Sequence, residues 1–483
     1  MAIESKSGVL NEVLAHLKSR VLRNMLVRTI SVRLQASGGE GLFQNAFALL
    51  CVQFFRKILP IITIPYLARV LGPGGWGLVA TFQSLALTMV LLIEFGFPFS
   101  ATRRVACGKQ SQEDVSDIWA GVVGAQALLA AGAIVLTGIL CLFVPMMRDH
   151  ISLTVWALVW AIAEGMNPVW YFLGMERMDI IALLEICTKV AMTCCLIGFV
   201  RSDQDTYRVI AIQAIAPIVS LLVAMSLVHR GVPFRVPTLL LIKKSMSGSL
   251  SLFMMRSAEG MYTLANGFLL GMLAGPGVVG YFAGPEKISR ALIGVFNPVR
   301  ETLYPRLSKL IHSSPHQAAR LARAGMMITG FGGLAMGLCV FFFAPYLVKL
   351  ILGPGFEPAV GVLRILALLP PLISVTQSVG MGWLLPLGRD RIVTRSMGLG
   401  ALINLVLAFL LIPQFAQTGI AWAVVSAEAF VCAMVLYSAV NDAERRLPIL
   451  PPYPWLEQDG EEALVAKPAV TVEHEKSLLN KSR

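Results

Sequence analysis

Residues 54–77 read FFRKILPIITIPYLARVLGPGGWG, an apolar helix with two adjacent cations, Arg56 and Lys57, well inside it. Pro60 and Pro65 each remove an amide donor and leave a carbonyl four residues earlier without its usual partner. In lipid such groups are tolerated only where protein or water satisfies them. The stretch therefore predicts a broken transmembrane helix that forms part of a cavity wall.

A related turn returns in the second half of the chain. The first helix stops at the sequence GPGGWG, residues 72–77, and the sequence GPGVVG follows 203 positions later, at residues 275–280. Matching breaks in two halves are typical of the internal repeats of transporters. We therefore expect two related halves.

The composition indicates a membrane protein. The 483 residues are 56% apolar and only 14% charged, and the mean hydropathy is +0.72. A soluble domain carries about 25% charged residues and could not form a wettable surface with so few. The formal net charge of +12 does not predict a nucleic-acid partner, because no soluble basic domain exists to carry the excess.

Apolar runs of about 20 residues are long enough to span a bilayer, and the sequence contains twelve candidates. They lie near 44–70, 77–99, 118–144, 151–173, 180–200, 208–228, 247–272, 279–303, 325–352, 361–385, 393–412 and 418–440. We thus predict an all-α polytopic protein with two six-helix lobes around a central cavity. The expected segments are a basic amphipathic segment 1–41, lobes 42–228 and 247–440, a linker 229–246 and a disordered tail 441–483.

Basic residues set the expected orientation. Lys and Arg concentrate in the loops that are inside if the N-terminus is cytoplasmic, and this asymmetry predicts that both termini are cytoplasmic. Arg177 and Lys309 should then face the cytoplasm, whereas Gly75 and Gly277 should face outward. The N-terminal segment fits a helix lying on the anionic inner leaflet; a disordered basic leader is the alternative.

Charges inside the predicted spans are the candidate functional residues, because each costs about 3 kcal/mol at the bilayer centre. Glu185 with Lys189 and Glu286 with Arg290 can pair at i,i+4. The cations are Arg56, Lys57, Lys189, Arg256, Lys287, Arg290 and Arg364, and the acids are Glu94, Glu164, Glu185, Glu259, Glu286 and Glu428.

The cations that their own helices do not readily pair, Arg56, Lys57, Arg256 and Lys287, predict a cationic cavity for an anionic passenger. The alternative is a set of ion pairs between helices with no ligand. Three acids, Glu94, Glu164 and Glu428, have no evident partner on their own helix and are candidates for ion or proton coupling. Each could instead pair with a cation on another helix.

The sequence shows no catalytic constellation. It lacks a Walker motif, its six histidines lie outside the predicted spans, and its cysteines show neither a CxxC nor a Cys/His spacing. We therefore predict a protein that is not an enzyme, with no metal and no cofactor.

Five short runs recur in order along residues 42–440. They are LARVLGPGGWG (67–77), WYFLGMERM (170–178), YPRLS (304–308), GALINLVL (400–407) and GIAWA (419–423). This ordered set resembles the bacterial polysaccharide transporters, the lipid-linked oligosaccharide flippases of the multidrug/oligosaccharidyl-lipid/polysaccharide exporter superfamily.

The resemblance implies a V-shaped bundle of six plus six helices, with the seventh span facing the first. It also implies alternating access that moves an undecaprenyl-diphosphate-linked glycan from the inner to the outer leaflet of the bacterial inner membrane. The lipid bilayer, a polysaccharide polymerase and export machinery are the implied partners. The expected substrate-binding residues are Arg56, Lys57, Arg256, Lys287 and Arg290.

Other functions remain open. A lipid II flippase would carry the same diphosphate but more often has fourteen spans. A cation-coupled multidrug exporter should show a cavity dominated by acids and aromatic residues. A purely structural scaffold fits poorly with broken, charged spans.

Overall fold

The computed structural model describes residues 39–111, 114–233 and 235–441. Nearly all of the predicted segments 1–41 and 441–483 lie outside this part of the chain. In α3, side chains are described from Leu59 onward, so those of Arg56 and Lys57 lie outside it too. The helices are α3 (Gly39–Glu94), α4 (Phe97–Ser111), α5 (Val115–Phe143), α6 (Pro145–Asp149), α7 (Ile151–Gly165), α8 (Val169–Gly174), α9 (Met178–Phe199), α10 (Thr206–His229), α11 (Leu239–Thr263), α12 (Asn266–Ala274), α13 (Pro276–Ile293), α14 (Asn297–Ser313), α15 (Pro315–Ile351), α16 (Ala359–Leu366), α17 (Leu369–Val379) and α18 (Asp390–Val440).

These helices make twelve passes within the described residues, as the sequence predicts. The longest two each contain two passes, because α3 breaks at Gly72, with φ 65°, and α18 breaks at Ala416, with φ 48°. Three further passes are composite: α11 with α12, α13 with α14, and α16 with α17. The last break comes three residues after Pro413, so this proline lies inside a helix and not between two spans.

The outer surface of the helices is apolar, as a lipid environment requires. Seven helices of the described residues are long and apolar enough to cross a membrane. Large side chains such as Leu142, Phe143 and Phe331 are exposed to 70% or more. Hydrocarbon is the medium in which such side chains lie exposed at no cost, because in water they would form an aggregation-prone patch.

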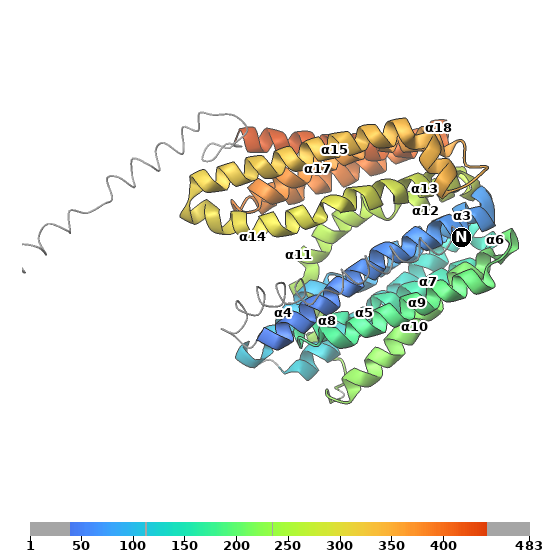
Figure 1. Ribbon diagram of the computed structural model, residues 1–483. Coiled ribbons are helices and arrows are strands. Elements are labelled where there is room, and N and C mark those ends of the chain that lie inside the picture. Colours follow the sequence, from blue (N-terminus) through green and yellow to red (C-terminus); the bar gives the residue numbers. More distant parts are fainter. Residues whose placement is uncertain (1–38, 112–113, 234, 442–483) are drawn as a thin grey trace, which may run out of the picture.

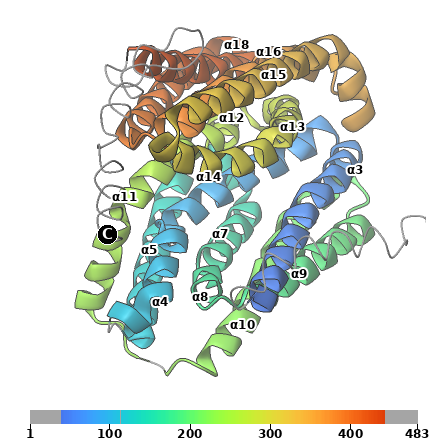
Figure 2. The same ribbon diagram turned by 60° about the vertical axis from the view of Figure 1, so that its left-hand side comes forward.

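The helices form two bundles. Figure 1 shows α14, α15, α17 and α18 in one bundle and α5, α7, α9 and α10 in the other, with α3 on the inner side of the second. Both views show the bundles diverging away from α12 and α13 (Figure 2). The predicted architecture of two six-helix lobes is therefore confirmed.

Two related turns join the bundles at the end where they converge. A Cβ on Gly77 would lie 2.0 Å from the carbonyl oxygen of Pro276, and a Cβ on Gly280 would lie 2.1 Å from that of Pro73. Each of these paired turns, residues 72–77 and 275–280, therefore packs its proline carbonyl against the last glycine of the other. The contact is reciprocal, as an approximate two-fold relation between the halves requires.

The seventh pass contacts the second pass, not the first, through its glycines. Positions 260, 267 and 271 lie against Leu91, Ser84 and Thr81 of the second half of α3. The paired turns account for these contacts, because they place the helix that follows Gly72 next to α12 and α13.

Two ion pairs connect the linker between the bundles to the start of α5. Arg235 forms ion pairs with Asp114 and Asp117. The hydrogen bond from the backbone N–H of Ser116 and the nearby Arg235 guanidinium hold the pKa of Asp114 below its ordinary value. In the same region, the hydroxyl of Ser245 on α11 accepts a hydrogen bond from Arg104 on α4.

The turn between α9 and α10 predicts a pH dependence of stability. Asp205 accepts hydrogen bonds from the N–H groups of Arg201 and Ser202 at 2.9 and 3.1 Å and pairs with Arg208 at 2.6 Å. These contacts, the backbone bond first, lower the pKa of Asp205. Its contribution to stability is therefore present above its unfolded pKa of about 4 and is lost as the pH falls through the lower folded value.

We expect Asp205→Asn to lower the midpoint of thermal unfolding in detergent at pH 7. The gap to wild type should narrow as the pH is lowered to 3. Asp203→Asn, an exposed carboxylate on the same turn, is the control. A difference in unfolding midpoint that is the same at pH 7 and pH 3 would contradict the assignment of this pH dependence to Asp205.

Candidate functional site

The seventh pass is interrupted in the middle of the protein, and Ser84 of α3 spans the break. Helix α11 ends at Thr263 and α12 begins at Asn266. The Ser84 hydroxyl accepts a hydrogen bond from the N–H of Phe268 at 3.0 Å and donates one to the carbonyl of Leu264. Backbone groups released by a break at membrane depth must find such partners, because lipid offers none.

A pocket of about 290 Å³ lies beside this break. It is formed by the second half of α3, the α11–α12 break and α13, so both bundles contribute to it. Its charged residues are Glu286, Lys287 and Arg290, all on α13. The other lining residues are Ala80, Gln83, Ser84, Leu87, Thr263, Leu264, Gly267 and Ala283. We call it the central pocket.

Lys287 is held by uncharged groups. Its ammonium donates a hydrogen bond to Gln83 Oε1 at 2.7 Å and lies 4.5 Å from the centre of the Trp76 ring. Trp76 is 1% exposed and belongs to the first of the paired turns. Among the described residues no carboxylate forms an ion pair with Lys287. The lysine charge is therefore stabilised by an amide dipole and a ring face, and it stays available to an anion.

Arg290 connects an acid to the helix break. Its guanidinium pairs with Glu286 at 2.9 Å and donates a hydrogen bond to the carbonyl of Thr263 at 3.2 Å. The predicted i,i+4 pair is therefore present. Because Arg290 is exposed, its remaining N–H groups can reach a ligand in the central pocket.

The other predicted cations are not in this pocket. Arg256 lies 3.9 Å from Glu94 and 5.5 Å from the centre of the Phe99 ring. This contact joins α11 to the end of α3, and it matches the alternative in which charges pair between helices. The structure thus brings together Lys287 and Arg290 but leaves Arg256 apart, while the side chains of Arg56 and Lys57 lie outside the described residues.

The three coupling candidates lie in separate places. Glu164 on α7 lines a second pocket of about 210 Å³, inside the N-terminal bundle, together with Glu185, Lys189 and Gln213. Glu185 and Lys189 pair at 3.9 Å, as their spacing predicts. We call this the acidic pocket. Glu428 is 7% exposed inside the C-terminal bundle, and Glu94 pairs with Arg256.

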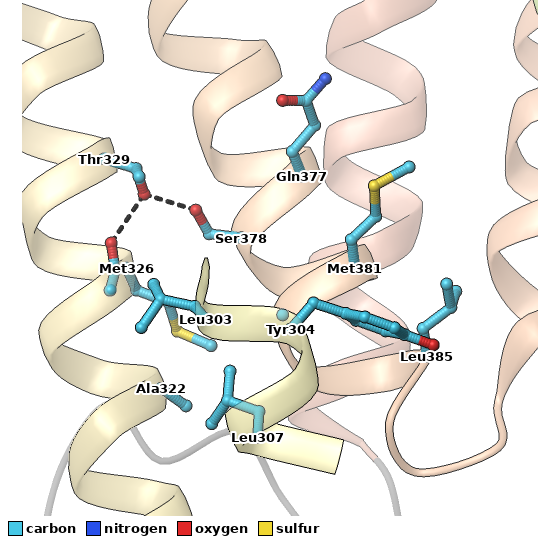
Figure 3. Close-up of a pocket in the computed structure, with 12 residues that line it drawn as sticks. Leu303, Tyr304, Leu307, Ala322, Met326, Thr329, Gln377, Ser378, Met381 and Leu385 are labelled. Carbon is cyan, nitrogen blue, oxygen red and sulfur yellow. Dashed lines mark hydrogen bonds between the residues drawn. The ribbon is translucent and has the colours of Figure 1, made fainter. Parts of the chain in front are cut away.

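A third pocket is apolar. It measures about 510 Å³ and lies between α14, α15, α17 and the π-helical turn Gly380–Leu384. Figure 3 shows Leu303, Leu307, Met326 and Leu385 around it, with the hydroxyls of Thr329 and Ser378 hydrogen-bonded to each other. No charged residue lines it. An anion would find no partner there, so the central pocket remains the candidate anion site.

Sequence reasoning missed the polar uncharged residues of the central and acidic pockets. Gln83, Ser84 and Gln213 lie in apolar spans, and each hydrogen-bonds a residue at least 130 positions away. The available signal is an amide or hydroxyl in an apolar helix, since such a group needs a partner at membrane depth. The sequence alone does not show which partner it finds.

The fold and the site define a multi-pass membrane transporter of two helical bundles with a polar pocket between them. Similarity to known proteins supports this class. Residues 42–311 match the model of the family described as "Polysaccharide biosynthesis protein", and the chain belongs to this family.

Two curated relatives cover most of the chain. A protein named "Putative O-antigen transporter" from Escherichia coli (strain K12) is 29% identical over 403 residues, which are 83% of this chain and 97% of the relative. A protein of the same name from Shigella dysenteriae is 24% identical over 400 residues, 81% of this chain and 98% of the relative. These relatives are transporters, in agreement with the prediction of a transporter and not an enzyme.

Solved structures share the fold. The lipid II flippase MurJ in an inward closed conformation superposes with a TM-score of 0.61 at 12% identity, covering 80% of this chain and 86% of that one. An inward-facing multidrug resistance MATE transporter gives a TM-score of 0.57 at 13% identity, covering 79% and 93%. At these identities the likeness concerns the fold alone.

Proposed function

We propose that this protein moves an undecaprenyl-diphosphate-linked oligosaccharide from the inner to the outer leaflet by alternating access. The observation that carries the proposal is the central pocket, where Lys287 and Arg290 meet at a broken helix between the two bundles. The names of the curated relatives, which describe O-antigen transporters, support a lipid-linked glycan as the passenger.

A diphosphate fits this pocket chemically. Arginine can bind phosphate oxygens with two parallel N–H groups, and lysine adds a point charge. The positive end of the α12 dipole points toward the same pocket, because Gly267, in its first turn, lines it. Together these groups replace the water that a diphosphate loses when it leaves the headgroup region.

The alternatives fit less well. A cation-coupled drug exporter would need acids in the passenger pocket, yet the acid of the central pocket, Glu286, is already paired with Arg290. A lipid II flippase shares the fold, and its substrate also carries a diphosphate. The two functions differ in the sugar that the lipid carries.

Deletion of the gene tests the proposal. We expect the glycan to accumulate on undecaprenyl diphosphate at the inner leaflet and the surface polysaccharide to disappear. Purified protein in liposomes should restore transfer of the same lipid-linked glycan to the opposite leaflet. Accumulation of lipid II, with surface polysaccharide unchanged, would identify the lipid II alternative instead.

We also propose that the protein lies in the bacterial inner membrane, with both termini and the linker 229–246 in the cytoplasm and the paired turns outside. A polymerase and export machinery are its proposed partners. The remaining proposed segments are the amphipathic N-terminal segment 1–41, the lobes 42–228 and 247–440, and the tail 441–483.

Labelling with an impermeant maleimide tests this orientation in a cysteine-free variant. A cysteine at Gly74 or Gly277 should react in intact cells, because open space surrounds both positions. A cysteine at Arg177 or Lys309 should react only after the cells are opened. External labelling at position 309 would contradict the orientation.

A further inference from the structure

Two hydrogen bonds connect the central pocket to the acidic pocket through α3. Lys287 donates to Gln83 Oε1 at 2.7 Å, and Gln83 Nε2 donates to Gln213 Oε1 at 3.0 Å. Gln83 lines the central pocket, and Gln213 lines the acidic pocket together with Glu164 and Glu185. Both glutamines are buried, so neither bond is exchanged readily for bonds to water.

The lysine fixes the direction of both amides. An ammonium group can only donate, so Gln83 must turn its oxygen to Lys287 and its NH2 group to Gln213. Gln213 must then turn its own oxygen back to Gln83. Its NH2 group is therefore turned away from Gln83, in a residue that lines the acidic pocket.

We propose that Gln83 and Gln213 form a relay that couples anion binding at Lys287 to proton binding by Glu164 in the acidic pocket. This inference rests on the proposed function, because it assigns the anion to the central pocket. An anion that takes the lysine N–H groups removes the donor that holds Gln83, and the Gln83 amide can then reverse.

The reversal changes what the acidic pocket receives. A reversed Gln83 presents its oxygen to Gln213, which must then turn its NH2 group toward Gln83 and its oxygen away from it. An NH2 group stabilises a carboxylate, whereas an oxygen accepts a hydrogen bond from a protonated carboxyl. Anion binding therefore favours protonation of the acid, and by linkage protonation favours anion binding by the same factor.

The ion pairs around the relay distinguish the two acids of the acidic pocket. Glu185 is paired with Lys189 on α9, whereas no ion pair of the described residues includes Glu164. At the other end, Glu286 and Arg290 pair with each other beside Lys287. Glu164, which shares the acidic pocket with Gln213, is thus the acid that we assign to the end of the relay, and Lys287 is the cation at its start.

Calorimetry with inorganic diphosphate tests the relay in the full-length protein in lipid nanodiscs. Titrations at pH 6 in two buffers of different ionisation enthalpy give the number of protons taken up per diphosphate bound. We expect wild type to take up more protons than Gln213→Leu or Glu164→Gln. The protons that the diphosphate itself takes up or releases are the same in all samples, so they cancel in the difference between wild type and variant.

Two further variants separate the relay from damage to the fold. Gln83→Met breaks the relay from α3 and should reduce proton uptake as Gln213→Leu does. Thr137→Val removes a buried hydroxyl on α5 of the same bundle, outside both pockets, and should behave as wild type. The ratio of the diphosphate affinity at pH 6 to that at pH 8 should fall about fivefold when the relay is broken.

The outcomes separate the two proposals. Binding that requires Lys287, with equal proton uptake in wild type and Gln213→Leu, would overturn the relay and leave the proposed function standing. Absence of diphosphate binding, or binding that is unchanged in Lys287→Met, would overturn the proposed function and the relay with it.

Discussion

Transport of lipid-linked glycan is expected to be lost when Lys287 and Arg290 are both replaced by methionine, at normal abundance of the protein in the membrane. Each charge-assisted hydrogen bond to a diphosphate contributes about 1.5–3 kcal/mol. Loss of one such bond from each residue would weaken binding by about a hundredfold or more. The assay is transfer of radiolabelled lipid-linked glycan in liposomes containing the purified variant.

Arg290→Met alone leaves Glu286 without its partner, so the pair should also be neutralised together. The variant Glu286→Gln, Arg290→Met keeps the net charge of the pair and replaces both of its charged groups in the pocket by neutral ones. We expect it to transport poorly as well. Arg290→Lys should give an intermediate rate, because lysine keeps the charge but not the planar fork.

Arg364→Met is the matched control for a cation in a span. Arg364 is exposed and lies 5.6 Å from the centre of the Phe341 ring, outside the central pocket. This variant should transport at close to the wild-type rate. Transport by the Lys287 and Arg290 double variant at more than half of the wild-type rate would show that these cations serve only the structure.

A methyl group at either glycine of the paired turns is expected to have the second large effect. The Cβ of Gly77→Ala would lie 2.0 Å from a backbone oxygen, and that of Gly280→Ala would lie 2.1 Å from another, closer than real Cβ contacts come. Because both obstacles are main chain, no side chain can move aside, and the turns must separate by about 1 Å. Transport should fall severely.

The separation of the paired turns should also be detectable in an assay that does not measure transport. A cysteine at Ala80, in the central pocket, should become accessible to an impermeant maleimide from outside in Gly77→Ala. Gly74→Ala and Gly277→Ala are the matched controls, because nothing lies within 4 Å of a Cβ at either position. Wild-type transport by Gly77→Ala would show that close contact of the turns is not needed.

Local patterns in the sequence predicted much of the fold. Twelve apolar runs became twelve passes, because the hydrogen bonds of a helix in lipid are satisfied within each run. The breaks were predicted at the sequences GPGGWG and GPGVVG, and Gly72 and Gly275 have the positive φ that glycine adopts readily in such turns. The pairs Glu185–Lys189 and Glu286–Arg290 were predicted because residues four apart share one helical face.

Contacts between distant segments were decided only by the tertiary structure. Arg256 was grouped with the substrate-binding cations, yet it pairs with Glu94 on another helix. Lys287 has its partner 204 positions away, in Gln83, and no local pattern indicates that distance. The central pocket itself depends on this placement, because its walls come from α3, the α11–α12 break and α13.

By itself, the sequence determined the number of passes, the positions of their breaks and the charges available inside the membrane, because these properties depend on residues within a few turns of each other. The structure decided which charges share a pocket, and that glycines of the seventh pass contact the second pass. The reason is packing: helices approach where glycine permits, as at the paired turns, and the rotation of each packed helix determines which side chains meet.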